Sequence, residues 1–111
     1  MSGQDQIVQI QQAKELMESA NKQFRINGTE YAENEKNYRI ALAKKILILK
    51  EEGYAATLIL DLSRGDEAVA ELKQKRDISS TLMNSAQMAV YNYRLEYRLL
   101  NEQSRQDMMN G

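Results

Sequence analysis

From Asp66 to Met109 the chain contains neither glycine nor proline. Along this stretch, seam positions recur with alternating spacings of three and four, which is the a/d pattern of coiled-coil packing. The positions are Val69, Leu72, Arg76, Ser79, Met83, Ala86, Val90, Tyr93, Tyr97 and Leu100. The pattern predicts one unbroken helix, which would be about 65 Å long at 1.5 Å per residue.

Glycine supplies the other breaks, because the 111-residue chain has no proline at all. Gly53 is suited to end a helix in the left-handed conformation, and Asp66 is suited to cap the start of the next one. Gly28 and Gly65 mark two further breaks. The predicted helices cover about 5–25, 29–52, 55–62 and 66–109.

Two interpretations of the break at Asn27-Gly28 agree on its place. If Asn27 is the N-cap, Glu30 completes a capping box, and Ile26 and Tyr31 close over it as a hydrophobic staple. Alternatively, Gly28 is the left-handed end of the first helix. In either case one helix ends here and another begins.

The helix predicted over 29–52 carries two apolar stripes. The first comprises Tyr31, Tyr38, Leu42, Ile46 and Leu49, and the second comprises Ile40, Ala43 and Leu47. Two stripes predict burial on two sides and therefore a central position for this helix.

These elements predict an all-α fold in a single domain, residues 1–111. The architecture is an elongated antiparallel helical hairpin or coiled coil, with an amino-terminal helix and a short helix at the hairpin end. The helix over 29–52, at about 35 Å, covers only half of the long helix. The remaining seam residues must pack on the first helix or on another subunit, and we expect a homo-oligomer. The predicted interface residues are Val90, Tyr93, Tyr97 and Leu100.

The amino-acid composition excludes several classes of functional site. The chain has no cysteine and no histidine, so it offers no zinc thiolate or imidazole, no cysteine nucleophile and no Ser-His-Asp triad. Its net charge of −1 disfavours bulk nucleic-acid binding. No apolar run approaches the about 20 residues of a transmembrane helix, and the first residues lack the features of a signal peptide. We expect a non-enzymatic cytoplasmic protein with no catalytic residue, metal, cofactor or membrane contact.

A second stripe beside the seam comprises Tyr91, Arg94, Arg98 and Arg105. Arg94 and Arg98 are like charges one turn apart, which costs about 0.2–0.5 kcal/mol unless an anion relieves it. Guanidinium groups beside a tyrosine could hold a phosphate and stack a base. The more common arrangement is that such arginines pair with acidic residues of the facing helix.

Arg76 and Ser79 place polar groups at consecutive seam positions, where they can fix register or oligomer state. One hypothesis makes Arg76 a buried anchor for a partner's carboxylate. The favoured one is an exposed or loosely packed seam near Gly53 and Tyr54, because a buried charge needs a partner.

The region from the second helix through residue 62 imitates a helix-turn-helix. Residues 55–62 are almost wholly apolar and include Asp61, whereas a recognition helix presents polar and basic groups to DNA. We predict that this segment is a lid that caps the hairpin end.

Several stretches resemble a known group of proteins. They are Tyr38-Arg39-Ile40-Ala41-Leu42-Ala43-Lys44, Glu51-Glu52-Gly53-Tyr54-Ala55-Ala56-Thr57-Leu58-Ile59, and Arg64-Gly65-Asp66 followed by Val69-Ala70-Glu71-Leu72 and Arg76-Asp77-Ile78. Over about 31–100 the chain resembles small, uncharacterised helical proteins encoded by phages and prophages of Gram-positive bacteria. The resemblance implies a phage-encoded accessory protein in the host cytoplasm, acting on early DNA metabolism or against host defence, and it implies no active site.

The leading hypothesis is an oligomeric helical binding protein, an accessory or inhibitory factor that contacts a host or phage protein. Val90, Tyr93, Tyr97 and Leu100 would supply the anchors of helix-in-groove recognition. The first alternative is a sponge that sequesters a small anionic nucleotide through the arginine stripe. The second is a nucleic-acid-binding accessory protein, which a steep salt dependence of affinity would reveal.

Overall fold

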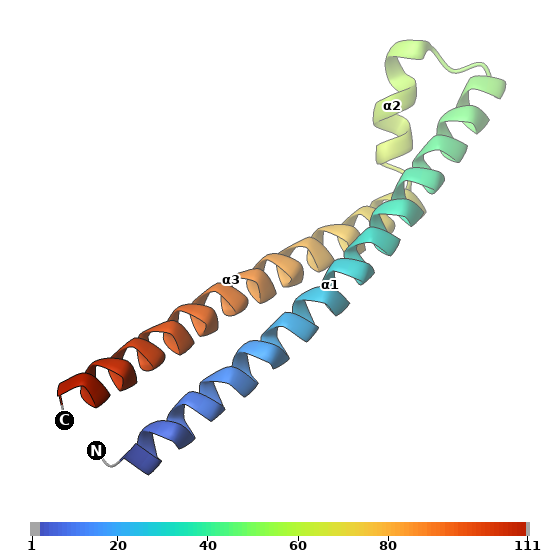
Figure 1. Cartoon of the computed structure of the whole chain (residues 1–111). Coiled ribbons are helices and arrows are strands. Elements are labelled where there is room, and N and C mark those ends of the chain that lie inside the picture. Colours follow the sequence, from blue (N-terminus) through green and yellow to red (C-terminus); the bar gives the residue numbers. More distant parts are fainter. Residues whose placement is uncertain (1–2, 111) are drawn as a thin grey trace. The chain divides into compact units, whose positions relative to one another are not determined.

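The computed structural model describes residues 3–110 and shows an all-α hairpin (Figure 1). Its helices are α1 (Gly3–Glu51), α2 (Ala56–Arg64) and α3 (Glu67–Asn110). The two long helices run antiparallel, since Asn34 contacts Ser79 whereas Asn27, earlier in α1, contacts the carbonyl of Leu82, later in α3. The prediction of an all-α helical hairpin is confirmed.

The described residues fall into two compact units, and both long helices contribute to each. Unit 1 contains residues 3–26 of α1 and residues 83–110 of α3. Unit 2 contains residues 27–82, and therefore the end of α1, all of α2 and the start of α3. Unit 1 is an antiparallel helix pair, and unit 2 is such a pair with α2 in addition.

The core of unit 1 is built from small and medium side chains. Ala13 and Ala20 of α1 and Ala86 and Val90 of α3 are buried. Ile10, Met17 and Phe24 of α1 are half-buried. These five positions of α1 follow one another at spacings of three and four, so they form one packed face of the helix.

The predicted helix break at Asn27-Gly28 is wrong, because α1 continues through it to Glu51. Asn27 does not cap a helix; its side-chain amide donates a hydrogen bond of 3.3 Å to the carbonyl of Leu82. Phe24, Asn27 and Tyr31 follow one another at spacings of three and four, so the heptad phase passes through the dipeptide unbroken. A lone glycine inside such a helix costs only about 1 kcal/mol.

In unit 2, only one of the two apolar stripes predicted for the helix over 29–52 is packed. The first predicted stripe is buried or half-buried, with Tyr38 and Leu49 in the core. The second stripe is exposed, since Ile40 is 46% and Leu47 59% accessible. The predicted central position of this helix is wrong, because unit 2 provides no neighbour for that side among the described residues.

Gly53 ends α1 as predicted. Its φ of 84° is left-handed, its N–H donates to the carbonyl of Lys50 at 3.1 Å, and the N–H of Tyr54 donates to the carbonyl of Leu49 at 3.2 Å. These two bonds form a Schellman motif and satisfy carbonyls that the helix end would otherwise leave open.

Asp66 caps α3 as predicted. Its carboxylate accepts the N–H of Val69 at 3.2 Å and lies 3.4 Å from the Nζ of Lys45 on α1. The hydrogen bond from Val69, supported by Lys45, lowers the pKa of Asp66 below its ordinary value. Between Gly53 and Asp66 lies α2, whose residues Ile59 and Ser63 are buried within unit 2.

Candidate functional site

The four predicted interface residues lie on the inner face of unit 1. Val90 is 8% exposed, and Tyr93, Tyr97 and Leu100 are half-buried. Of the two covers considered for this stripe, the first helix and another subunit, the structure shows the first, because α1 reaches the far end of α3. There Gln6 donates a hydrogen bond to Asp107, and Ile10 lines the same small hollow as Leu100.

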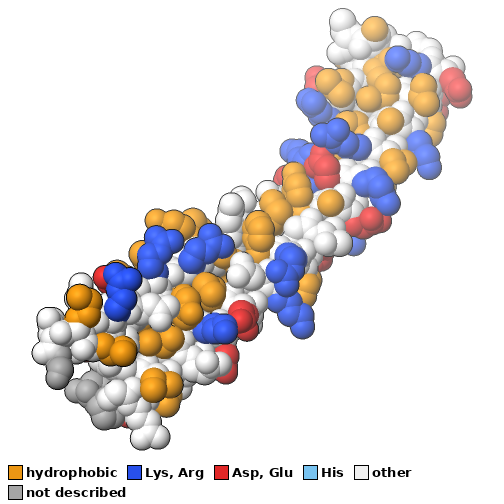
Figure 2. All heavy atoms as spheres, in the orientation of Figure 1, with side chains coloured by type: hydrophobic (Ala, Val, Ile, Leu, Met, Phe, Trp, Pro, Cys, Tyr) orange, Lys and Arg blue, Asp and Glu red, His pale blue; other side chains and the backbone are white. Residues whose placement is uncertain are grey.

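A different face of α3 is exposed and apolar. We call it the outer stripe: Met88, Tyr91, Leu95 and Leu99. These side chains follow at spacings of three, four and four, so they share one face of the helix. Tyr91 is 62% and Leu99 60% accessible. Figure 2 shows hydrophobic side chains reaching the surface among basic ones on the side in view.

The arginine stripe is partly assembled. Arg94, Arg98 and Arg105 line a shallow hollow of about 290 Å³ together with Tyr97, and all of its lining residues belong to α3. Tyr91 does not line this hollow. Arg105 pairs with Glu102 of its own helix at 3.4 Å, and neither Arg94 nor Arg98 has an ion-pair partner within residues 3–110. The expected pairing with the facing helix is therefore not found there.

The side chain of Arg76, at a seam position of α3, has three partners within the chain. Its guanidinium lies 3.3 Å from the carboxylate of Glu35 on α1 and 2.9 Å from that of Asp77, and it stacks over the ring of Tyr38 at 4.6 Å. The hydrogen bond to Asp77 raises the pKa of Arg76. The favoured prediction of a loose seam is wrong here, since Arg76 has its carboxylate partner within its own chain.

Glu35 is shared between two arginines. Arg39, one turn along α1, donates a hydrogen bond of 2.6 Å to it, and Arg76 approaches from α3. These cations lower the pKa of Glu35 below its ordinary value, with the Arg39 bond the largest cause. Glu35 therefore stays ionised and ties α1 to α3.

Two asparagines of α1 complete a polar seam that the sequence analysis missed. Asn34 donates a hydrogen bond of 2.6 Å to the hydroxyl of Ser79, and both residues are buried. The signal was available: Asn27 and Asn34 continue the heptad phase of Phe24 and Tyr31. Polar pairs at seam positions specify register, because any slip leaves them without partners.

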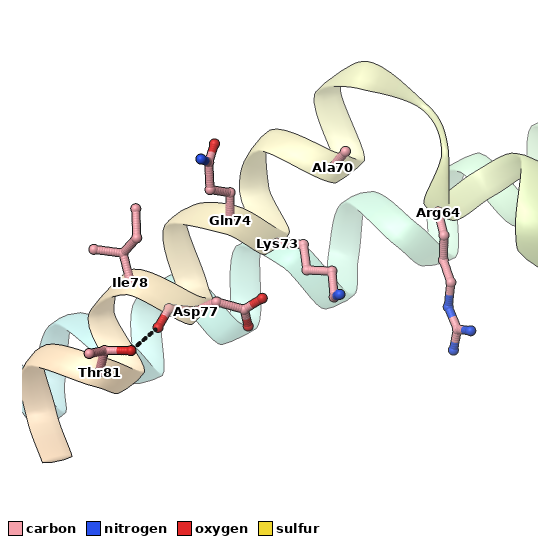
Figure 3. A pocket seen from close by; sticks show the side chains of 7 residues that line it. All are labelled: Arg64, Ala70, Lys73, Gln74, Asp77, Ile78 and Thr81. Atoms are coloured by element: carbon pink, nitrogen blue, oxygen red, sulfur yellow. Dashed lines mark hydrogen bonds between the residues drawn. The ribbon is translucent and has the colours of Figure 1, made fainter.

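Unit 2 also contains a basic cleft, which we define by the residues that line it. The cleft measures about 660 Å³ and draws on all three helices; its lining residues are Glu35, Tyr38, Arg39, Leu42, Arg64, Lys73 and Arg76. A second hollow of about 500 Å³ also contains Arg64 and Lys73 in its wall. Figure 3 shows these two side chains with their charged ends turned to the same side.

Within residues 3–110, no cluster of three or more histidine, cysteine, aspartate or glutamate side chains could hold a metal ion. None of the helices in that range combines the length and apolar character of a membrane span. Comparison of the chain with family models, with curated proteins and with solved structures gives no match.

Proposed function

We propose that the chain is a non-enzymatic helical binding protein that works through protein–protein contact, beginning with self-association through the outer stripe. One observation carries the proposal: four large side chains on one face of α3, from Met88 to Leu99, are exposed. A contiguous apolar surface of this kind in a folded protein marks an interaction site. We therefore assign self-association to the outer stripe instead of the predicted interface at Val90, Tyr93, Tyr97 and Leu100.

A second copy is the occupant that we assign to the outer stripe. Glu96 lies on one flank of the stripe and Arg98 on the other, so the flanks carry opposite charges. Two copies with Leu95 and Leu99 packed together can bring opposite charges to both edges of the contact. Symmetric dimers need such a self-complementary patch.

Light scattering on the intact chain tests the proposal. A single chain has a mass of 12.8 kDa, and we expect a multiple of that mass in solution. Leu95→Glu combined with Leu99→Glu should return the protein to the single-chain mass with its helical circular dichroism preserved. Ile40→Glu, on an exposed position of unit 2, is the control and should leave the mass unchanged. A wild-type protein at 12.8 kDa would contradict self-association.

The proposal extends to a phage context, which is supported by the resemblance over about 31–100. In that setting the same surface would dock a host or phage protein in the cytoplasm, as an accessory or inhibitory factor. The test is a pull-down with wild type and the double glutamate variant side by side. A partner that the variant captures equally well would exclude the outer stripe as its docking surface.

A second candidate function is the binding of a small anionic nucleotide at the arginine stripe. The observation that favours it is that Arg94 and Arg98 have no acidic partner within residues 3–110. Calorimetry with a nucleotide panel should then show binding that Arg94→Ala or Arg98→Ala removes, while Lys22→Ala does not. Absence of heat across the panel would exclude this function.

A further inference from the structure

The basic cleft of unit 2 is distinct from both surfaces just discussed. Its walls come from three helices: Tyr38 and Leu42 from α1, Arg64 from the last turn of α2, and Lys73 from α3. Its volume of about 660 Å³ lies within the range of small-molecule sites, about 300–1,000 Å³. The basic cleft is lined by residues of three helices, whereas the hollow at Arg94 is lined by residues of α3 alone.

The charges in the cleft are unbalanced. Four cationic side chains line it, and Glu35 is the sole acid among its lining residues. Glu35 forms ion pairs with both Arg39 and Arg76. Arg76 also pairs with Asp77, which does not line the cleft. Arg64 and Lys73 have no acidic partner within residues 3–110. Folding therefore brings two uncompensated cations to one opening, an arrangement that an anion would relieve.

We propose that this cleft, with Arg64 and Lys73 as its main contacts, binds the phosphate groups of a small polyphosphate ligand. A guanidinium fork matches phosphate oxygens bidentately, and a lysine supplies a compact second charge. Two free cations at one opening match a ligand that carries several negative charges on adjacent groups.

The cleft recognises the phosphate chain rather than an attached base. Tyr38, the aromatic residue of the lining, is 6% exposed, and Arg76 lies over its ring. No face of that ring is open for base stacking. Inorganic triphosphate and a nucleoside triphosphate therefore bind with similar affinity, and a nucleoside without phosphate does not bind.

Calorimetry on the full chain at low ionic strength tests this site with inorganic triphosphate, adenosine triphosphate and adenosine. We expect saturable binding of both triphosphates and none of adenosine. Arg64→Gln and Lys73→Gln should each weaken triphosphate binding about tenfold, as expected for the loss of one charge-assisted contact. Both residues are exposed, so neither change disturbs the core.

Lys75→Gln is the matched control, because Lys75 is exposed on the same helix and does not line the cleft. It should bind triphosphate like the wild type. Glu35→Gln should strengthen binding, because it frees Arg39 and removes one of the two carboxylates that pair with Arg76. A merely structural role for these residues would not produce a gain.

Four results would overturn the proposal. The first is no binding of either triphosphate, and the second is an equal loss in Lys75→Gln, which would indicate diffuse charge attraction. The third is binding of a single-stranded oligonucleotide without binding of triphosphate, which would favour a nucleic-acid surface. If Arg94→Ala removes binding and Lys73→Gln does not, the site is the arginine stripe. Self-association through the outer stripe is independent of all these outcomes.

Discussion

The side-chain amide of Asn34 donates a hydrogen bond of 2.6 Å to the hydroxyl of Ser79, a residue 45 positions later in the chain. That hydroxyl in turn donates to the carbonyl of Lys75 at 2.7 Å. The bonds form a chain across the interior of unit 2, where an unsatisfied group would be costly. The pair therefore sets the register of α1 against α3 in this unit.

Replacing Asn34 by Ala should destabilise the protein by about 1–3 kcal/mol, because the buried hydrogen bond between α1 and α3 is lost and the Ser79 hydroxyl keeps only its bond to the carbonyl of Lys75. Ser79→Ala should cost a similar amount, because the Asn34 amide is then buried without an acceptor. The measurement is urea unfolding followed by circular dichroism.

The double variant Asn34→Ala with Ser79→Ala removes both polar groups, so its loss should be clearly smaller than the sum of the two single losses. The exposed Asn92→Ala serves as control, with a change within about 0.5 kcal/mol. Additive losses in the double variant would show that the two side chains are not coupled.

The ionisation of Glu35 makes the stability of the folded protein depend on pH. Its pKa is lowered in the folded protein, mainly by the hydrogen bond from Arg39 and also by Arg76. The folded state thus favours the carboxylate, so this contribution is present above the ordinary pKa of 4.5 and is lost as pH falls through the lowered value.

The midpoint of thermal unfolding of the wild type should accordingly fall more steeply on acidification than that of Glu35→Gln. The difference between the two proteins should develop below about pH 4.5 and shrink in high salt, because Arg39 is exposed. Parallel curves for the two proteins would show that Glu35 does not contribute in this way.

The sequence predicted the parts of the fold that depend on local signals. Gly53 ends α1 and Asp66 caps α3 because a glycine and a short acidic side chain act on backbone groups within a turn of themselves. The seam of α3 was equally readable, since every heptad position from Val69 to Leu100 is buried or half-buried. Those features do not require knowledge of the partner helix.

The candidate site was not readable in the same way. Nothing in the sequence marks Arg64 and Lys73, and Arg76 is marked only as a polar seam position. Only the packing of all three helices brings these cations beside Glu35 and Tyr38. The predicted interface failed for a related reason: the sequence did not show that the first helix packs on this part of α3, as residues 3–26 do in unit 1. A strong local capping pattern at Asn27 concealed the longer heptad that passes through it.

Gly53→Ala should lower stability by about 1–2 kcal/mol, because a φ of 84° places a Cβ in the left-handed region. Nothing lies within 4 Å of that Cβ position, so the cost is conformational and not steric. Gly53→Asn should lose less, because asparagine tolerates this conformation. Urea unfolding measures both, with Gly3→Ala as the control in open surroundings. Equal stability of Gly53→Ala and wild type would contradict the Schellman end.

Gly28→Pro distinguishes a continuous α1 from two helices that meet at this dipeptide. If a helix began after an Asn27 cap, residue 28 would be its first position, where proline is favoured. In the continuous α1 the same proline removes a hydrogen bond and clashes with the preceding turn, at a cost of about 3 kcal/mol.

We therefore expect Gly28→Pro to lose about 3 kcal/mol in urea unfolding, together with part of the helical circular dichroism. Gly3→Pro is the matched control, because it places the same residue in the first described turn of α1, where a missing N–H breaks no ladder bond. If the two variants were equally stable, α1 would have to contain a break at residue 28.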